Sequence, residues 1–523
     1  MSSVLAIDLG TGGPKVALIS RDGEVLGSDF EPTPVLMLPG GGAEQRPGDW
    51  WEATTAASRR LLERDPAQAR TVRGVAVTGQ WAGTVAVDER GEPLCDALIW
   101  LDARGAAHAR RLAGGPLRVA GYDPRKLFRW LRLTGGAPSL SGRDALGHLL
   151  WLRAERPELY AGASCFLEPV DWMGLKLTGR AATSGATATL HWVTDTRDIR
   201  RLRYDDDLVA LAGLDRAKLL ELLATNTVLG PLTEDARAAL GLPEPVPVVA
   251  GTPDMMSAAV GSGAVADHAT HLYVGTSAWL ACHVPYKRTD PLHSVASLPS
   301  AVPGRYLVSS EQETAGASVE RLRDALLPGS GIQGFEELER LAAQAAPGSG
   351  GVVFTPWLNG ERTPVDDHLV RGGLHNLSLD TTRAQVVRAV FEGVALNARW
   401  MQLYVERLCR RRLEPIAFIG GGALSPLWGQ IMADVLGRTV ERAAAPVNAG
   451  VRGAGLLGWL ALNELTVEDL HGRAAIVARH EPRGEHRATY ERLFAAFRVL
   501  YKASRRARGP LAAVRRDHQE TPT

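Results

Sequence analysis

Three short apolar runs, each followed closely by glycine, recur along the chain. They cover residues 4–8, 270–274 and 415–419. An apolar run of this length before a glycine turn is typical of a buried strand that enters a tight loop. The pattern therefore predicts three strand–loop units, and the first two of them open the two halves of the chain.

Longer stretches between these runs predict helices. They cover residues 49–64, 144–156, 381–410 and 426–436. Further strands are expected over residues 15–20, 72–78 and 84–88. Strands that alternate with helices predict an α/β architecture. Because both halves begin with a strand followed by Gly-Thr, we expect a duplicated domain with a cleft between the two copies.

The middle of the chain is interrupted by Pro243, Pro245, Pro247 and Gly251. We place a domain boundary there, which gives an N-terminal domain of residues 1–250 and a C-terminal domain of residues 251–485. In the terminal segment, residues 486–523, apolar positions three and four apart over 490–501 predict an amphipathic helix with a solvated basic end. A loop is expected at residues 329–334.

The composition is that of a folded protein of two or three domains. The 523 residues carry 59 Lys and Arg against 58 Asp and Glu, a net charge of +1. This balance argues against a protein that binds nucleic acid or an anionic membrane surface. No apolar run reaches the roughly 18–20 residues that span a bilayer, and the N-terminus lacks the basic region of a secretion signal. The four cysteines are widely spaced and suggest neither a zinc site nor a disulfide framework, so we expect a cytoplasmic protein.

Candidate chemistry lies in the three glycine loops. In the first, Gly10, Thr11 and Gly12 could turn backbone N–H groups and a hydroxyl toward an anion, and Asp8 could hold a hydrated Mg²⁺. A plain β-hairpin has a similar sequence. The second loop, Gly275, Thr276 and Ser277, repeats this chemistry. The third loop contains Gly421, Gly422 and Ala423, which offer a flat surface for a base or ribose, although glycines also suit any tight turn.

A further candidate is Asp254, which follows an apolar strand and opens a helix of small residues. An acid there can simply cap the helix. Alternatively, it can be the catalytic base of a phosphoryl transfer, in which one carboxylate takes the proton of the substrate hydroxyl.

The segment at residues 453–458 formally matches GxGxxG. A dinucleotide site would require a preceding core strand, and the residues before this segment read as a loop. The glycines lie within an apolar helical stretch, which favours close helix packing.

The three loops, in this order, resemble the phosphate-1, phosphate-2 and adenosine motifs of the actin, sugar-kinase and chaperone ATPase superfamily. Further blocks lie at residues 44–51, 79–83, 100–104, 359–364 and 420–434. With them the chain resembles the FGGY family of carbohydrate kinases, and most of all its xylulokinases, from residue 4 to about residue 502.

This resemblance implies two ribonuclease-H-like domains that close on Mg²⁺·ATP and a sugar in an interdomain catalytic cleft. It implies transfer of the γ-phosphate to a hydroxyl of a ketopentose or related polyol, with Asp254 as the base and Asp8 as the acid associated with the metal. It places the nucleotide at Gly10, Thr11, Gly12, Gly275, Thr276, Ser277, Gly421, Gly422, Ala423 and Asn448. It places the sugar at Gln80, Trp81, Ala82, Trp100, Asp102 and Asp254. By analogy with the family, a homodimer is expected.

The chain departs from the xylulokinase pattern at two points. Xylulokinases usually read Gly-Gln-Met-His-Gly where this chain has Trp81 and Ala82, and they usually place Asn after the base where this chain has Met255. Loss of hydrogen-bonding groups weakens discrimination between hydroxyls. Because of these departures, xylulose is only the first expectation for the substrate. A kinase for ribulose, erythritol or glycerol, or a superfamily ATPase that is not a kinase, is the alternative.

Overall fold

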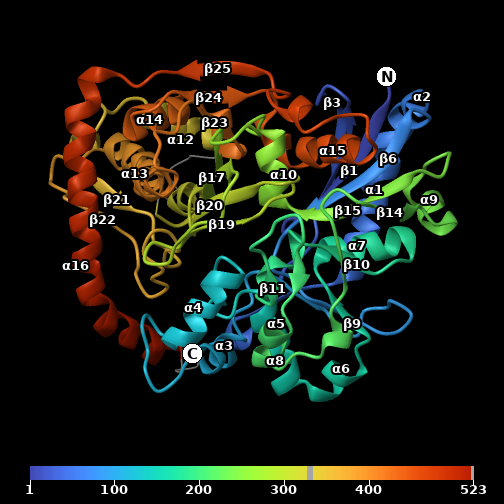
Figure 1. Ribbon diagram of the computed structural model, residues 1–523. Helices are drawn as coiled ribbons and strands as arrows, with labels where there is room; N and C mark the ends of the chain where they lie inside the picture. Colours follow the sequence, from blue (N-terminus) through green and yellow to red (C-terminus); the bar gives the residue numbers. More distant parts are fainter. Residues whose placement is uncertain (327–333, 520–523) are drawn as a thin grey trace.

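A computed structural model describes residues 1–326 and 334–519 (Figure 1). Of the loop expected at residues 329–334, only Gly334 lies within this part, and the last four residues of the predicted terminal segment lie outside it. No helix in the described part is both long and apolar enough to cross a membrane.

The first large sheet has the strand order β14-β15-β6-β1-β2-β3. β1 pairs with β2 antiparallel and with β6 parallel, and β15 is parallel to β6. The carboxyl ends of β1, β6 and β15 therefore meet at one edge of the sheet. The bounds are β1 Ser3–Gly10, β2 Gly13–Ser20, β3 Val25–Phe30, β6 Val72–Gly79, β14 Val228–Pro231 and β15 Pro247–Pro253.

The second large sheet has the order β18-β19-β20-β17-β16-β23-β24-β25. Its central part, β20-β17-β16-β23-β24, repeats the arrangement β3-β2-β1-β6-β15 in the first sheet, with the last two strands parallel to β16. The predicted duplication is confirmed. The bounds are β16 Thr270–Val274, β17 Ala278–Val284, β18 Thr289–Asp290, β19 Val295–Pro299, β20 Tyr306–Gln312, β23 Ile416–Ile419, β24 Val440–Ala443 and β25 Ile476–His480.

Five small sheets complete the strands of the described part. Their strands are β4 Leu36–Leu38, β5 Gly42–Gln45, β7 Val85–Val87, β8 Ala97–Leu98, β9 Cys165–Leu167, β10 Ala182–Ser184, β11 Thr194–Asp195, β12 Arg203–Tyr204, β13 Glu221–Leu223, β21 Val353–Thr355 and β22 Gly373–His375. Most of them lie in the long connection between β6 and β15, beside helices α3 to α8 (Figure 1).

All four helices whose bounds the sequence predicted over residues 49–64, 144–156, 381–410 and 426–436 are present, and their ends differ from the prediction by at most two residues. The four predicted helices are α1, α5, α13 and α14. The bounds are α1 Pro47–Arg64, α2 Pro66–Ala69, α3 Ala106–Ala113, α4 Pro124–Leu133, α5 Ala145–Glu155, α6 Pro157–Gly162, α7 Pro169–Thr178, α8 Asp206–Ala212, α9 Glu234–Leu240, α10 Asp254–Gly261, α11 Gly316–Arg321, α12 Phe335–Ala342, α13 Arg383–Cys409, α14 Pro426–Leu436, α15 Ala449–Ala461 and α16 Arg487–Gln519.

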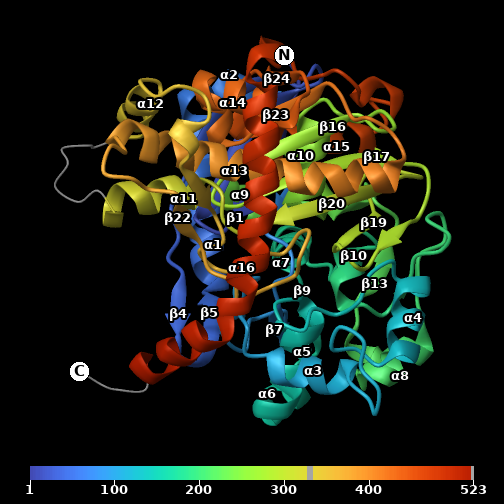
Figure 2. The same cartoon turned by 90° about the vertical axis from the view of Figure 1, so that its left-hand side faces the viewer.

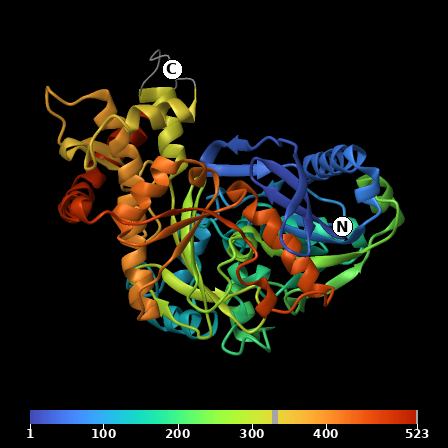
Figure 3. The same cartoon turned by 90° about the horizontal axis from the view of Figure 1, so that it is seen from above.

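Helices α10 and α15 lie between the two sheets, which stand side by side when seen from above (Figures 1 and 3). The two helices cross at glycine: a Cβ on Gly453 would lie 1.7 Å from the carbonyl oxygen of Ser257, and a Cβ on Gly261 would lie 1.8 Å from that of Ala449. Gly455 packs against Ile19 in the first sheet. The GxGxxG segment therefore serves close helix packing, as predicted.

The C-terminal helix α16 runs down one side of the second half (Figure 2). Tyr490 and Phe497 are fully buried in the core of that half, which confirms the predicted amphipathic helix. Its basic end is not wholly solvated, because Arg508 pairs with Asp367, whose exposed fraction is 4%. The helix is thus also held by an ion pair.

Candidate active site

Asp8 and Asp254 come together at the carboxyl edge of the first sheet. Asp8 lies on β1 opposite Thr78 of β6, and Pro253, the last residue of β15, lies opposite Gly79 of β6. Asp254 follows as the first residue of α10. Both carboxylates therefore lie at the same edge of the sheet, and β6 separates the strands β1 and β15 that carry them there.

The surroundings of Asp8 suit an acid that takes part in binding a cation. It faces Lys15 across the β1–β2 ladder, and the first turn of α15 approaches so closely that a Cβ on Gly450 would lie 2.5 Å from Asp8 Oδ2. The N-terminal end of a helix stabilises a carboxylate. Burial nevertheless raises the pKa of Asp8, and the charge of Lys15 opposes that rise only in part. Lys15 donates to the carbonyl of Val447 at 2.8 Å.

Asp254 has the pKa expected of a general base. Burial first, and then the charges of Asp8 and Glu311, raise its pKa to about 7. Its Oδ1 accepts a hydrogen bond of 2.7 Å from the N–H of Met255. The residue that caps α10 is Pro253, so Asp254 is not the helix cap. A carboxylate that titrates near neutral pH is well matched to proton abstraction.

The first glycine loop is the turn between β1 and β2. The hydroxyl oxygen of Thr11 accepts a hydrogen bond of 2.9 Å from Trp100 Nε1, and its carbonyl accepts one from the Gln45 amide at 2.9 Å. Gly13 has a φ of 135°, and a Cβ there would lie 2.1 Å from the carbonyl oxygen of Glu31, so only glycine fits. Gly12 is exposed and open to a ligand.

The second and third loops lie together at the carboxyl edge of the second sheet. Gly275 donates to Ser277 at 2.9 Å across the β16–β17 turn, which leaves Thr276 exposed. Gly420, with a φ of 87°, packs against the end of β16, where a Cβ would lie 2.5 Å from the carbonyl oxygen of Val274. The N–H of Gly420 also donates to Pro446 at 3.0 Å. The structure thus brings the 275–277 loop, the 420–423 loop and the 446–448 turn, which contains Asn448, to one place.

The predicted sugar residues divide into two kinds. Gln80 donates to Gln45 at 2.8 Å, while its Oε1 is buried without a partner in the described part of the chain. Trp81 donates to the Thr187 carbonyl at 2.8 Å, and Ala82 adopts a φ of 62° next to it. Trp100 contacts Thr11 of the first loop directly, whereas Gln80 is linked to Thr11 through Gln45.

Asp102 is different, because it is fully buried and both of its oxygens accept hydrogen bonds from the protein. Oδ2 accepts from the N–H of Ala43 at 2.9 Å, and both oxygens accept from Arg104. This carboxylate ties the segment after Trp100 to β5, so its direct use as a substrate ligand stays a prediction.

Sequence reasoning gave no role to the 359–364 block, which the fold brings to the same region. The Arg362 guanidinium lies 5.3 Å from the centre of a Trp100 ring and pairs with Glu311 and Glu313 of the second half. The only sequence signal for Arg362 was that it belongs to this family-like block. Glu311 and Glu313 lie outside it, and nothing in the sequence indicated that they would pair with an arginine beside Trp100.

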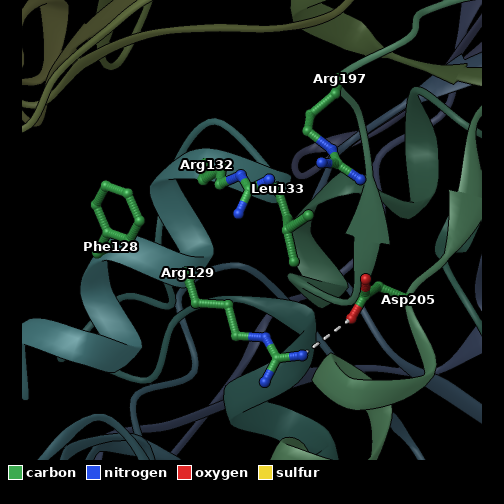
Figure 4. A pocket seen from close by; sticks show the side chains of 6 residues that line it. All are labelled: Phe128, Arg129, Arg132, Leu133, Arg197 and Asp205. Carbon is green, nitrogen blue, oxygen red and sulfur yellow. Dashed lines mark ion pairs between the residues drawn. The ribbon is translucent and has the colours of Figure 1, made fainter.

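A pocket of ≈ 390 Å³ lies away from these residues, between α4 and the short strands β11 and β12 (Figure 4). Three arginines line it, but Arg129 pairs with Asp205 and Asp207, and Arg197 pairs with Asp195. Two of the three positive charges are therefore already balanced by protein carboxylates.

The comparisons with known proteins cover almost the whole chain. The N-terminal domain of the FGGY family of carbohydrate kinases matches residues 3–261, and the C-terminal domain of that family matches residues 272–462. The chain is 28% identical to a xylulose kinase of Staphylococcus epidermidis over 98% of this chain and 99% of the relative. It is 29% identical to the xylulose kinase of Escherichia coli, over 95% and 98%.

Solved structures agree with this fold. The chain superposes on the xylulose kinase of Rhodospirillum rubrum with a TM-score of 0.81 and 26% identity, over 97% of this chain and 100% of that one. A ligand-bound xylulose kinase from Lactobacillus acidophilus gives a TM-score of 0.85 at 20% identity, over 98% and 100%, which supports the fold alone.

Proposed function

Since the chain belongs to the FGGY family of carbohydrate kinases, and is therefore an ATP-dependent sugar kinase, we propose that its substrate is a ketopentose or related polyol. Xylulose is the first candidate. The observation that carries the proposal is the meeting of Asp8, Asp254 and the Thr11 loop at one sheet edge, with Trp100 beside them. Such an edge can hold the γ-phosphate and a hydroxyl side by side. The protein would act in the cytoplasm on small-molecule substrates.

In this mechanism Asp254 accepts the proton of a substrate hydroxyl as that oxygen attacks the γ-phosphorus in line, while the bond from the γ-phosphorus to the bridging oxygen breaks and ADP leaves with that oxygen. The amides of the 10–13 and 275–277 loops hold the phosphates, and the 421–423 loop with Asn448 supports the adenosine. Approach of the two halves excludes water and limits hydrolysis of ATP.

Asp8 fits Mg²⁺, because this ion usually keeps several waters and takes one or two carboxylates together with substrate phosphates. No cluster of three or more potential metal ligands occurs among residues 1–326 and 334–519, so a site built from protein groups alone is not indicated. When bound, Mg²⁺ neutralises charge on the β- and γ-phosphates. Asp8 would hold its water shell, and the charge of Lys15 on the neighbouring strand favours the ionised form of Asp8.

The identity of the sugar depends on the loop around Trp81 and Ala82. Ala82 brings no hydrogen-bonding group, and Trp81 has its N–H engaged by Thr187. A site without a polar partner discriminates poorly between hydroxyls at that position. The substrate range is therefore expected to extend beyond xylulose to other ketopentoses and short polyols.

A coupled ADP-release assay tests the proposal. The panel contains ketopentoses, tetritols, glycerol and hexitols, with a control that lacks sugar. One sugar should raise ADP release well above the control, and D-xylulose should be among the best. A flat panel with slow basal hydrolysis would instead favour a superfamily ATPase that does not act on these sugars.

The pH dependence of the reaction should follow Asp254. The base must be ionised to act, and its pKa is raised to about 7. We therefore expect kcat/KM for the sugar to rise about tenfold per pH unit below pH 7 and to level off above about pH 8. Steady-state kinetics in constant-ionic-strength buffers measure this limb. A profile that is flat between pH 5.5 and 8 would contradict the assignment of Asp254 as the titrating base.

A further inference from the structure

Arg362 is held firmly at the end of β20, in the C-terminal half. Oε1 of Glu361 accepts hydrogen bonds of 2.9 Å from the N–H groups of Glu313 and Arg362. Burial raises the pKa of this carboxyl group to about 8, so it adds little charge to the cluster at neutral pH. The N–H of Thr363 donates to the Glu311 carbonyl at 3.0 Å. The 361–363 segment is therefore fastened to β20 through its backbone, and the direction in which the Arg362 side chain leaves it is defined.

The guanidinium of Arg362 reaches the N-terminal half. It lies 5.3 Å from the centre of a ring of Trp100, whose indole N–H donates to Thr11 in the first glycine loop. The same guanidinium pairs with Glu311, whose charge contributes to the raised pKa of Asp254. The side chain thus lies among the groups that flank the place where a hydroxyl would meet the γ-phosphate.

The cluster around Arg362 is electrically balanced. Glu313 accepts from Arg143 of the N-terminal half at 2.9 Å, from Asn359 at 2.9 Å and from Arg362 Nε at 2.5 Å. Two arginines therefore face two glutamates, Glu311 and Glu313. A neutral cluster is poorly suited to hold a free phosphate, whereas a guanidinium beside a carboxylate offers donors and acceptors for uncharged hydroxyls.

Two members of this cluster keep hydrogen-bonding capacity. The Glu313 side chain is 2% exposed and has three donors, but the side chains of Arg362 and Glu311 are 30% and 32% exposed. Within the described residues, Arg362 uses Nε and Nη1 for its carboxylates and no hydrogen bond is recorded for Nη2. The Nη2 donors and a Glu311 oxygen remain for a ligand.

We propose that Arg362 and Glu311 form a hydroxyl-binding subsite that the C-terminal half contributes to the sugar site. Arg362 Nη2 donates to one hydroxyl of the substrate, and the Glu311 carboxylate accepts from a neighbouring one. The sugar then lies beside this pair, on the side of the Arg362 guanidinium that is turned away from Trp100 of the N-terminal half. The inference rests on the proposed function, and it adds recognition by residues that lie outside the N-terminal half.

The test uses R362K in the full-length enzyme with the sugar that gives the highest ADP release in the wild type. Lysine keeps the charge and loses the fork of donors. We expect the KM for that sugar to rise roughly 10- to 100-fold, as for the loss of one charge-assisted hydrogen bond, while the KM for ATP changes less than about twofold. E311Q should raise the KM for the sugar in the same way.

The matched control is R412K. Arg412 pairs with Glu414 on the exposed surface, and both of its KM values should stay at the wild-type level. A purely structural role of Arg362 is distinguished by monodeoxy analogues of the sugar. Removal of the contacted hydroxyl should weaken wild-type binding and should have no further effect on R362K.

Equal changes in both KM values, or a lower melting temperature without an effect on the sugar KM, would overturn the subsite. If the wild type responds to a sugar and R362K keeps its KM, only this inference fails. If the wild type responds to no sugar, the proposed substrate class fails and the subsite falls with it.

Discussion

Replacement of Asp254 with alanine is expected to lower kcat by about 10²- to 10⁴-fold, the range for loss of a general base. The affinity for ATP should change little, because the loops at residues 275–277 and 421–423 belong to the other sheet. Steady-state kinetics with the best sugar give kcat, and calorimetric titration gives the dissociation constant for the nucleotide.

D254N is the matched control for structure. Its amide has nearly the shape of the carboxylate, and its oxygen can still accept the hydrogen bond from the Met255 N–H. It should keep the melting temperature of the wild type and lose activity as D254A does. The limb of the pH profile near pH 7 should also vanish. Near-normal turnover in either variant would remove Asp254 from the mechanism.

Replacement of Gly453 with alanine is expected to destabilise the protein by roughly 3 kcal/mol or more, at or above the upper end for overpacking. The added Cβ would lie 1.7 Å from the Ser257 carbonyl oxygen and 2.8 Å from the Gly261 nitrogen. Both atoms belong to the backbone of α10, so no change of rotamer relieves the clash and the two helices must separate. Urea unfolding followed by circular dichroism measures the loss.

The G453A substitution should also lower activity. Asp254 opens α10, and Gly450, which touches Asp8, lies in the first turn of α15. Separation of the helices would move both carboxylates, so kcat should fall in the fraction that remains folded. G509A in α16 is the control, because a Cβ there has no heavy atom within 4 Å and alanine is the better helix former. Wild-type stability of G453A would mean that α10 and α15 do not approach at backbone distance in solution.

Local sequence patterns sufficed for the elements that carry the site. The apolar runs before glycine predicted β1, β16 and β23, because a buried strand is apolar on both faces and a tight turn requires glycine. The 426–436 prediction coincides with α14, whose start is set by the Ser425 cap and Pro426. Helix ends elsewhere moved, since the last turns are decided by tertiary contacts.

The candidate site was only partly visible in the sequence. Asp8 and Asp254 could be named because each closely follows a run of apolar residues in the sequence. Asp102 looked equally available, yet its oxygens are taken by Ala43 and Arg104, and no pattern within the block reveals that. The exposure of a side chain and the partners of a carboxylate depend on which distant segments pack around it.

The sequence by itself determined the duplicated α/β fold, the three glycine loops and the acid that follows β15, because these features depend on residues that are neighbours along the chain. The tertiary structure alone decided which distant groups meet. It placed α15 on the first sheet, set Arg362 beside Trp100, and brought the sulfur atoms of Cys282 and Cys409, 127 positions apart, to 3.7 Å. Such contacts arise from the packing of whole helices and sheets, which short-range hydrophobic periodicity does not encode.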